Sequence, residues 1–221
     1  MGPAHDYIIL YNASSCQISL LNTSTGRKVV LPFLDISMPH PIWVGPDPIK
    51  SGEPVVLRGN SADFKTGILA LYHPIEREWV VIEESFSLHY PVAYFNGMYY
   101  VYNKKTGVTK VIDTVTRKAV HVVSPPHEDD YDCDAIVDVT YLLQSGGDIL
   151  RVVLHNNVLL EADCHFHIHR LNLQSGNGEE PCWVKISSIG DQILFLDKDN
   201  GFPLSCKEFS GFRGNSIYFI K

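Results

Sequence analysis

Short runs of apolar residues alternate with polar turns along most of the chain. The apolar residues are mostly Val, Ile, Leu, Tyr and Phe, in runs of about four to eight, and this is the composition of β-strands. Pro and Gly, with 13 and 16 residues, interrupt the sequence so often that few windows could hold a helix of ordinary length. The pattern predicts an all-β protein.

The clearest segment, residues 91–123, predicts four strands joined by three short loops. PVAYF and MYYVY flank the pair Asn96-Gly97. Asn-Gly between apolar runs favours a type I′ hairpin turn, because both residues tolerate a positive φ. VTKVID and KAVHVV follow, after turns at 103–107 and 114–117. An antiparallel meander of this size matches one blade of a β-propeller.

Four pieces of the chain share one form, in which an apolar strand, a polar turn and a second apolar strand follow one another. They cover residues 19–32, 69–84, 109–125 and 169–188, with turns near Asn22, His73, Asp113 and Asn172. Trp79 and Trp183 stand early in the second strand of their pieces. We therefore expect four or five blade-like antiparallel meanders, forming an incomplete propeller. A sandwich of unrelated hairpins and a helix near residues 148–163 are the alternatives.

The charge of the chain is concentrated in one segment. The formal net charge is -7, which argues against sequence-independent binding to the phosphate backbone of nucleic acids. Removing six clustered acidic residues leaves 19 acidic residues against 18 basic ones, and the six are Glu128, Asp129, Asp130, Asp132, Asp134 and Asp138. We expect this segment to be an acidic loop between blades, either solvated or in contact with a basic protein partner.

The same acidic segment also resembles the start of a calcium-binding loop. Asp130-x-Asp132-x-Asp134 has the opening spacing of an EF-hand, but Ala135 and Tyr141 stand where that loop needs Gly and Glu. The spacing therefore gives little support for bound calcium.

A second candidate for metal binding is HFHIH at residues 165–169. On a strand, His165, His167 and His169 project from one face, and three imidazoles on one face can hold zinc. Phe166 and Ile168 would occupy the buried face, so a polar face, turned to solvent or to a neighbouring blade, is the simpler interpretation. We expect no bound metal or other cofactor.

Sequence signatures of catalysis and of export are absent. The chain lacks the G-x-S-x-G, H-E-x-x-H, Walker A and G-x-G-x-x-G motifs. It has no signal-peptide pattern and no apolar run long enough to span a membrane. Five widely spaced cysteines without a C-x-x-C pair indicate reduced thiols. These features favour a non-enzymatic, intracellular protein of the cytoplasm or nucleus, or both, without a membrane partner.

Several ordered motifs resemble a known family. YLLQSGGDILRVV, FHIHRLNL, WVKISSIGDQILFLD and RGNSIYF occur in this order between residues 141 and 219. LLNTSTGRKVVLP, LALYHPIEREWVVI and FNGMYYVYNKKTGVTKVID precede them. Together they resemble the F-box-associated domain of unknown function 295 of plants, and the match covers most of the chain.

The resemblance implies a kelch-like β-propeller that recognises a protein substrate. In such proteins an F-box module before the propeller docks to a Skp-type adaptor of a ubiquitin ligase. Strand-like sequence begins here by Tyr7, so we expect a single propeller-like domain over residues 1–221 and no F-box module. A Skp-type adaptor would be a partner only if an F-box lies upstream. The alternative function is a propeller-type hydrolase or metal-binding protein with a central site.

Overall fold

The computed structural model describes the chain as a series of β-sheets. It covers residues 7–12, 14–34, 36–41, 55–61, 67–84, 91–104, 106–126, 136–156, 164–173, 180–197, 201–209 and 211–219. Within these ranges no helix has the length and hydrophobicity needed to cross a lipid bilayer. The chain divides into two compact units, Met1–Tyr90 and Pro91–Lys221.

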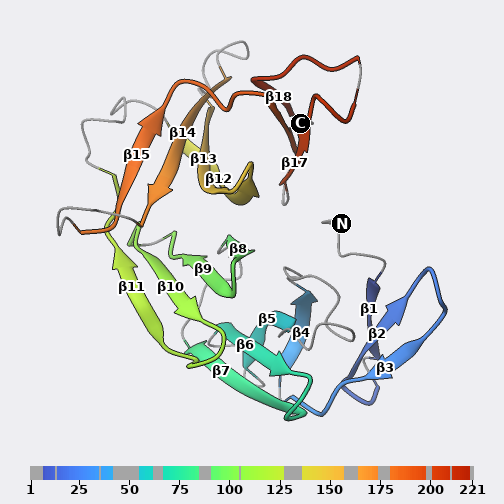
Figure 1. Ribbon diagram of the computed structural model, residues 1–221. Helices are drawn as coiled ribbons and strands as arrows, with labels where there is room; N and C mark the ends of the chain where they lie inside the picture. The colour runs from blue at the N-terminus through green and yellow to red at the C-terminus, as the bar shows by residue number, and fades with distance from the viewer. Residues whose placement is uncertain are drawn as a thin grey trace. The chain divides into compact units, whose positions relative to one another are not determined.

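The first unit holds two antiparallel sheets (Figure 1). One has three strands in the order β1 (Tyr7–Asn12), β2 (Gln17–Asn22) and β3 (Lys28–Val30). The other has four strands in the order β4 (Ile36–Pro41), β5 (Val55–Ser61), β6 (Gly67–His73) and β7 (Glu78–Glu84). In both sheets each strand pairs with the next along the chain, so the sheets are meanders.

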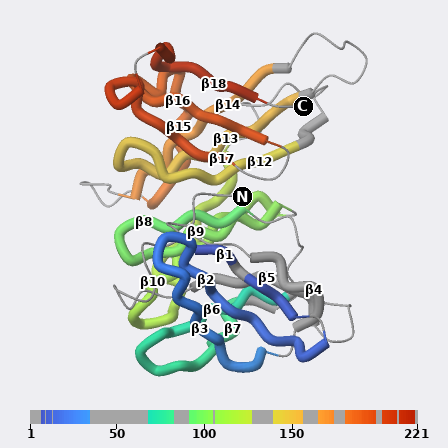
Figure 2. Tube along the Cα trace, turned by 90° about the vertical axis from the view of Figure 1, so that its right-hand side faces the viewer, coloured from blue at the N-terminus to red at the C-terminus, as the bar shows by residue number. Residues whose placement is uncertain are grey.

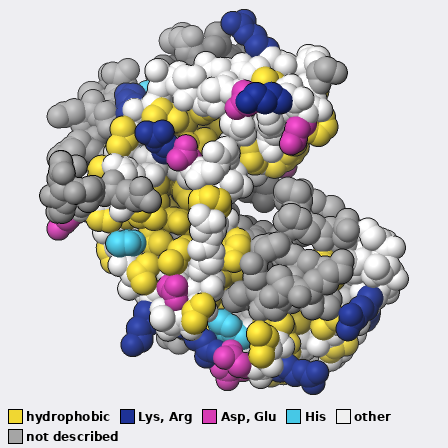
Figure 3. All heavy atoms as spheres, in the orientation of Figure 1, with side chains coloured by type: hydrophobic (Ala, Val, Ile, Leu, Met, Phe, Trp, Pro, Cys, Tyr) yellow, Lys and Arg dark blue, Asp and Glu magenta, His cyan; other side chains and the backbone are white. Residues whose placement is uncertain are grey.

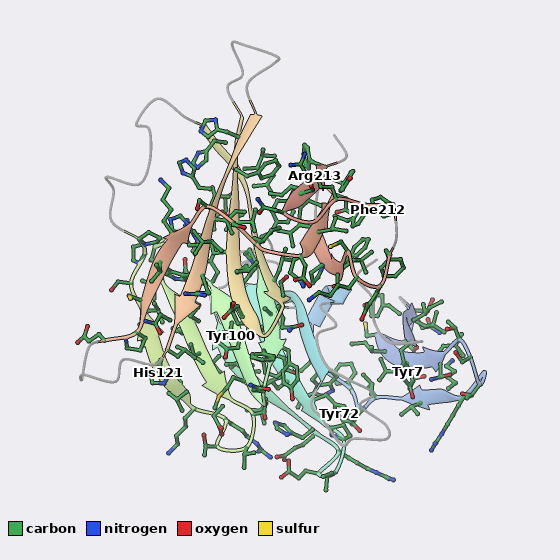
Figure 4. The ribbon with its side chains drawn as sticks, turned by 45° about the horizontal axis from the view of Figure 1, so that its top comes forward. Tyr7, Tyr72, Tyr100, His121, Phe212 and Arg213 are labelled. Atoms are coloured by element: carbon green, nitrogen blue, oxygen red, sulfur yellow. The ribbon has the colours of Figure 1, made fainter. Side chains whose placement is uncertain are left out.

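The core of the first unit joins these two sheets. Tyr7, Ile18, Leu20 and Leu31 from the first sheet and its flank pack against Tyr72 of β6. Figure 4 labels Tyr7 and Tyr72. The Trp79 indole on β7 lies 5.2 Å from the Tyr72 ring, and its N–H donates a hydrogen bond to the carbonyl of Pro32 at 3.0 Å. The Trp79 side chain therefore links the β4–β7 sheet to the segment that follows β3.

The second unit holds two four-stranded sheets and one three-stranded sheet (Figures 1 and 2). The first runs β8 (Val92–Phe95), β9 (Met98–Tyr102), β10 (Thr109–Asp113) and β11 (Ala119–Val123). The second runs β12 (Ile136–Ser145), β13 (Asp148–Asn156), β14 (Cys164–Asn172) and β15 (Cys182–Ile186). The third has the order β17 (Gly201–Ser205), β16 (Gln192–Leu196) and β18 (Ser216–Phe219), with β18 parallel to β16.

The sheet β12–β15 supplies side chains to two cores, because its side chains alternate between its two faces and a neighbouring sheet packs against each face. One face supplies Leu142, Ile149, Leu171 and Trp183 to a core shared with Tyr100, Tyr102, Val111 and Val123 of the preceding sheet. The opposite face supplies Tyr141, Leu143, Leu150, Val152 and Leu154 to a core shared with Leu194 and Leu196 of β16. Strand β12 also neighbours β8 and β17. Sheets stacked face to face in this way are typical of propeller blades.

The sequence prediction of strands is confirmed, and the four similar pieces form the last two strands of the four sheets that begin at β1, β4, β8 and β12. The predicted Asn96-Gly97 turn has φ values of 50° and 73°, as a type I′ hairpin requires. The alternative of a helix near residues 148–163 is wrong for residues 148–156. They form β13, since the β-branched Val152 and Val153 favour an extended backbone and both side chains are buried.

One turn geometry recurs between strands, at the repeated polar positions of the sequence. The carbonyl of the first residue accepts a hydrogen bond from the N–H four residues on, at 2.7–2.9 Å, and that last residue has a positive φ. The residue pairs are Asn22 and Gly26, His73 and Arg77, Asn103 and Gly107, and Asp113 and Arg117. The corresponding turn after Asn172 lies outside the described residues.

Candidate functional site

The three predicted histidines lie on β14, opposite β13. The register pairs His165 with His155, His167 with Val153 and His169 with Arg151. The imidazole rings of His155, His165 and His167 form a cluster in which ring centroids lie 4.6–5.4 Å apart. Sequence reasoning did not include His155, because its cross-strand partner is set only by the register of the sheet.

Burial differs sharply along this histidine face. His165 is exposed and His167 is half-buried, whereas His155 and His169 are 1% and 0% exposed. On β13, Arg151 donates a hydrogen bond to the Tyr102 hydroxyl at 3.1 Å, and its guanidinium lies 5.0 Å from the centroid of that ring. The face is thus packed against β9 of the neighbouring sheet. The sequence left two interpretations of this polar face, one turned to solvent and one turned to a neighbouring blade. For His169, the second interpretation is the correct one.

These histidines do not form a preassembled metal centre in the described ranges. There, no group of three or more His, Cys, Asp or Glu side chains is placed to hold a metal ion. The acidic loop residues Glu128, Asp129, Asp130, Asp132 and Asp134, which the sequence nominates for partner contact, lie outside the described residues. We therefore assign no ligand to either motif from geometry.

A polar hollow of about 250 Å³ lies in the second unit, where the β12–β13 turn meets the segment that leads into β16. Its apolar part is formed by Leu150, Ile186 and Ile189. Its polar part is formed by Ser145, Asp148, Arg170, Ser188, Asp191 and Gln192, with Gly146 in the turn. None of these polar residues was a candidate from sequence, because they come from three separate segments.

Charges of both signs line or border the polar hollow. The Arg170 guanidinium lies 3.9 Å from the Asp148 carboxylate, and both side chains are about half exposed. The Asp191 carboxylate contacts the Lys207 ammonium at 2.8 Å and accepts a hydrogen bond from the Gln192 amide at 3.0 Å. In Figure 3, basic and acidic side chains lie as neighbouring patches over the region that Figure 1 labels β12 to β18.

The contacts with Lys207 and Gln192 keep the Asp191 carboxylate in its charged form. The Lys207 hydrogen bond, followed by that of Gln192, lowers the pKa of Asp191 to about 2. A general acid or base works best with a pKa near the working pH, so Asp191 is poorly suited to proton transfer. The Ser145 hydroxyl lies 3.2 Å from the Gln192 amide oxygen, which is not a base that could activate it. The arrangement suits charge-based recognition better than acid–base chemistry.

A second exposed feature is an aromatic cluster on the β16–β18 sheet. Phe195 stacks between Phe202 and Tyr218 at centroid distances of 5.3 and 5.1 Å, and Phe212 meets Phe195 and Tyr218 edge-on. Figure 4 labels Phe212 next to Arg213. The other face of β16 carries Leu194 and Leu196, which are buried in the core. Strand alternation therefore places the aromatic cluster on the face of β16 opposite to Leu194 and Leu196.

Comparison with known proteins decides the family. The model of the KIB1-4 beta-propeller family matches residues 1–221. The chain belongs to the KIB1-4 beta-propeller family. Membership agrees with the all-β fold and with the expectation of a propeller. The more specific assignment to domain 295 made from the sequence motifs is not established by this match.

A curated relative connects the family to F-box proteins. The chain is 26% identical over 161 residues to a putative F-box/kelch-repeat protein of Arabidopsis thaliana. The aligned part is 69% of this chain and 40% of the relative, so the chain spans well under half of that protein. This similarity supports the broad assignment to kelch-like propellers associated with F-box proteins.

Solved structures give weaker likenesses. The β-propeller domain of the Trilobed protease from Pyrococcus furiosus has a TM-score of 0.49 and 11% identity, covering 86% of this chain and 55% of that one. Acylaminoacyl peptidase of Pyrococcus horikoshii has a TM-score of 0.43 and 13% identity, covering 86% of this chain and 31% of that one.

Proposed function

We propose that this KIB1-4 propeller is a non-catalytic protein-recognition domain that holds a protein partner at the polar hollow. The observation that carries the proposal is the state of the hollow's charged groups. Asp148 and Arg170 form an exposed, loosely spaced pair at 3.9 Å, while Asp191 is held as a carboxylate by Lys207. Fixed charges of both signs beside an apolar wall can be matched by a protein surface.

The relative supports a place for this domain in substrate selection. That relative is a putative F-box/kelch-repeat protein of Arabidopsis thaliana. The sequence motifs resemble domain 295, in which the propeller selects the protein that a ubiquitin ligase modifies. We infer the same role here, with an intracellular partner and with a Skp-type adaptor bound only through an F-box module outside residues 1–221.

Exchange of the charged pair in the hollow tests the proposal. Partners captured by chemical cross-linking in cell extract would be quantified for the wild-type chain, for Asp148→Ala and Arg170→Ala, and for the exchanged pair Asp148→Arg/Arg170→Asp. Lys118→Ala, on an exposed side chain between β10 and β11, is the control. We expect both single variants and the exchanged pair to lose the same partner, and the control to retain it.

The exchanged pair separates recognition from stability. If Asp148 and Arg170 served only each other, exchange would restore the ion pair and the partner would return. Restored capture would therefore contradict recognition at the hollow. Turnover of an ester or peptide substrate by the purified chain, abolished by Asp191→Asn, would contradict the non-catalytic role.

The acidic segment is a second possible contact within the same function. Neutralising Glu128, Asp129 and Asp130 should weaken binding of a basic partner at low salt, because charge attraction between exposed groups is strongest there. Unchanged affinity at low salt would show that the segment is solvated and takes no part in binding.

A further inference from the structure

A triangle of three imidazole rings lies at one end of the β13–β14 pair. His155 of β13 stands directly opposite His165 of β14, and His167 follows two residues further along β14 on the same face. The ring centroid of His155 lies 5.1 Å from that of His165 and 4.6 Å from that of His167, and the third side of the triangle is 5.4 Å. Each ring is therefore a neighbour of both others.

The triangle differs from the row of histidines that the sequence shows. Residues of a strand rise by about 3.3 Å each, so His165 and His169 are separated by about 13 Å along β14. One ion cannot bridge that distance, because a bond between zinc and a histidine nitrogen is about 2.0–2.1 Å long. His169 is paired with Arg151 instead and is buried. The cross-strand residue His155 is what brings three imidazoles together.

The spacing of the triangle is that of three imidazoles bound to one tetrahedral ion. With Zn–N bonds of about 2.0–2.1 Å and tetrahedral angles, the centroids of three bound rings lie about 5 Å apart. The observed separations of 4.6–5.4 Å bracket this value. Imidazole suits zinc as a ligand, and three protein ligands with water in the fourth position are a known zinc arrangement. The donor type and the spacing both point to zinc.

Ring orientation, rather than ring position, separates the described arrangement from a filled site. The planes of His155 and His165 are stacked at 17°, so their nitrogens do not converge, and no metal group is preassembled among the described residues. His165 is exposed, and its ring can turn about χ2, a torsion that is broad in histidine. His155 is 1% exposed and His167 is half-buried. Rotation of one exposed ring therefore completes the site on two more buried ones.

Other contacts of these histidines are compatible with a bound metal. An imidazole has two ring nitrogens, and a ligand histidine usually donates a hydrogen bond from the nitrogen that the metal does not use. The nearest cation on β13, Arg151, directs its guanidinium to the hydroxyl and the ring of Tyr102. The site thus requires neither unpartnered rings nor removal of that contact.

We propose that His155, His165 and His167 bind one Zn²⁺ ion, with water in the fourth position. The ion links β13 to β14 and stabilises the folded chain, because the unfolded chain does not hold the three rings together. Side chains alternate along a strand, so His165 and His167 lie on the other face of β14 from Arg170 of the polar hollow. Zinc binding is therefore independent of the proposed partner site.

Zinc titration of matched variants tests the site. The full chain, purified without metal, would be titrated with zinc in a calorimeter, and we expect one ion per chain. His155→Gln, His165→Gln and His167→Gln should each weaken zinc binding about tenfold or more. His121→Gln, at an exposed position of β11 labelled in Figure 4, is the control and should bind zinc as the wild type does. Zinc should raise the Tm of the wild type and the control, but not of His165→Gln.

Two spectroscopic measurements identify the ligands without a substitution at the buried position. Zinc should shift the assigned ring C–H signals of His155, His165 and His167 in the NMR spectrum and leave those of His121 unchanged. Cobalt(II) in place of zinc should give the absorption of a tetrahedral ion without a thiolate charge-transfer band. The second measurement separates the histidine site from native cysteines such as Cys182, which also bind zinc.

Several results would overturn the proposal. They are less than one zinc ion per chain at saturation, full affinity in His165→Gln, an equal loss of affinity in His121→Gln, or a thiolate band with cobalt. If His155→Gln does not fold, the NMR signal of His155 in the wild type decides its role, and an unchanged signal on addition of zinc contradicts the proposal.

Discussion

The recurrent turn makes a quantitative prediction about stability. Gly26 and Gly107 occupy the last position of equivalent turns, with φ values of 69° and 71°. A Cβ built on Gly26 meets nothing within 4 Å, whereas one on Gly107 lies 2.8 Å from the Cβ of Pro125. Substitution by alanine at both positions therefore separates the cost of the left-handed backbone from the cost of a steric clash.

The expected magnitudes follow from these contacts. The left-handed conformation costs a non-glycine residue about 1–2 kcal/mol, and alanine recovers about 0.4–1 kcal/mol by restricting the unfolded chain. Gly26→Ala should lower the free energy of unfolding by about 0.5–1 kcal/mol. Gly107→Ala adds overpacking against the proline ring, which costs about 1–3 kcal/mol, so its total loss should be about 2 kcal/mol or more.

Urea unfolding followed by far-UV circular dichroism measures both losses. A loss of 1 kcal/mol corresponds to a fall of about 2–4 °C in Tm for a chain of this size. Arg117→Gly provides the opposite test, because Arg117 has a φ of 60° at the equivalent position and glycine relieves that strain. It should stabilise the protein by about 0.5 kcal/mol. Equal losses for the two alanine variants, or destabilisation by Arg117→Gly, would refute the reasoning.

The second unit supplies three further predictions. Tyr102→Phe removes the hydroxyl that accepts the Arg151 hydrogen bond and should lower the free energy of unfolding in urea by about 1 kcal/mol. Arg151→Met also removes the contact of the guanidinium with the ring and should lower it by about 2–3 kcal/mol. Equal losses for the two variants would show that the ring contact adds no stability. Leu194→Ala, at a fully buried position, should cost about 2–5 kcal/mol, and a loss below 1 kcal/mol would contradict its place in the core. Lys207→Ala should raise the pKa of Asp191 from about 2 toward the ordinary carboxyl value in an NMR titration, and an unchanged pKa would exclude Lys207 as the main cause. Because the pKa of Asp191 is lowered in the folded state, the ion pair stabilises the protein at pH values above the ordinary carboxyl pKa. This stabilisation is lost as the pH falls toward 2.

Local sequence determined most of the strands. The apolar runs of β8 to β11 and the Asn96-Gly97 turn identified a complete four-stranded meander, because strand propensity and turn chemistry act within a few residues. The repeated turns at Asn22, His73 and Asp113 were also visible, since each is closed by hydrogen bonds within five residues. These features follow from short-range physics and needed no knowledge of the tertiary structure.

Only the tertiary structure decided which polar side chains meet. The polar hollow brings Asp148, Arg170 and Asp191 together from segments whose spacing along the chain carries no motif. His155 joins His165 because of the register between β13 and β14, and His169 is buried because a second sheet packs over its face. Such proximity depends on how sheets stack, and stacking is set by long-range packing that local periodicity does not encode.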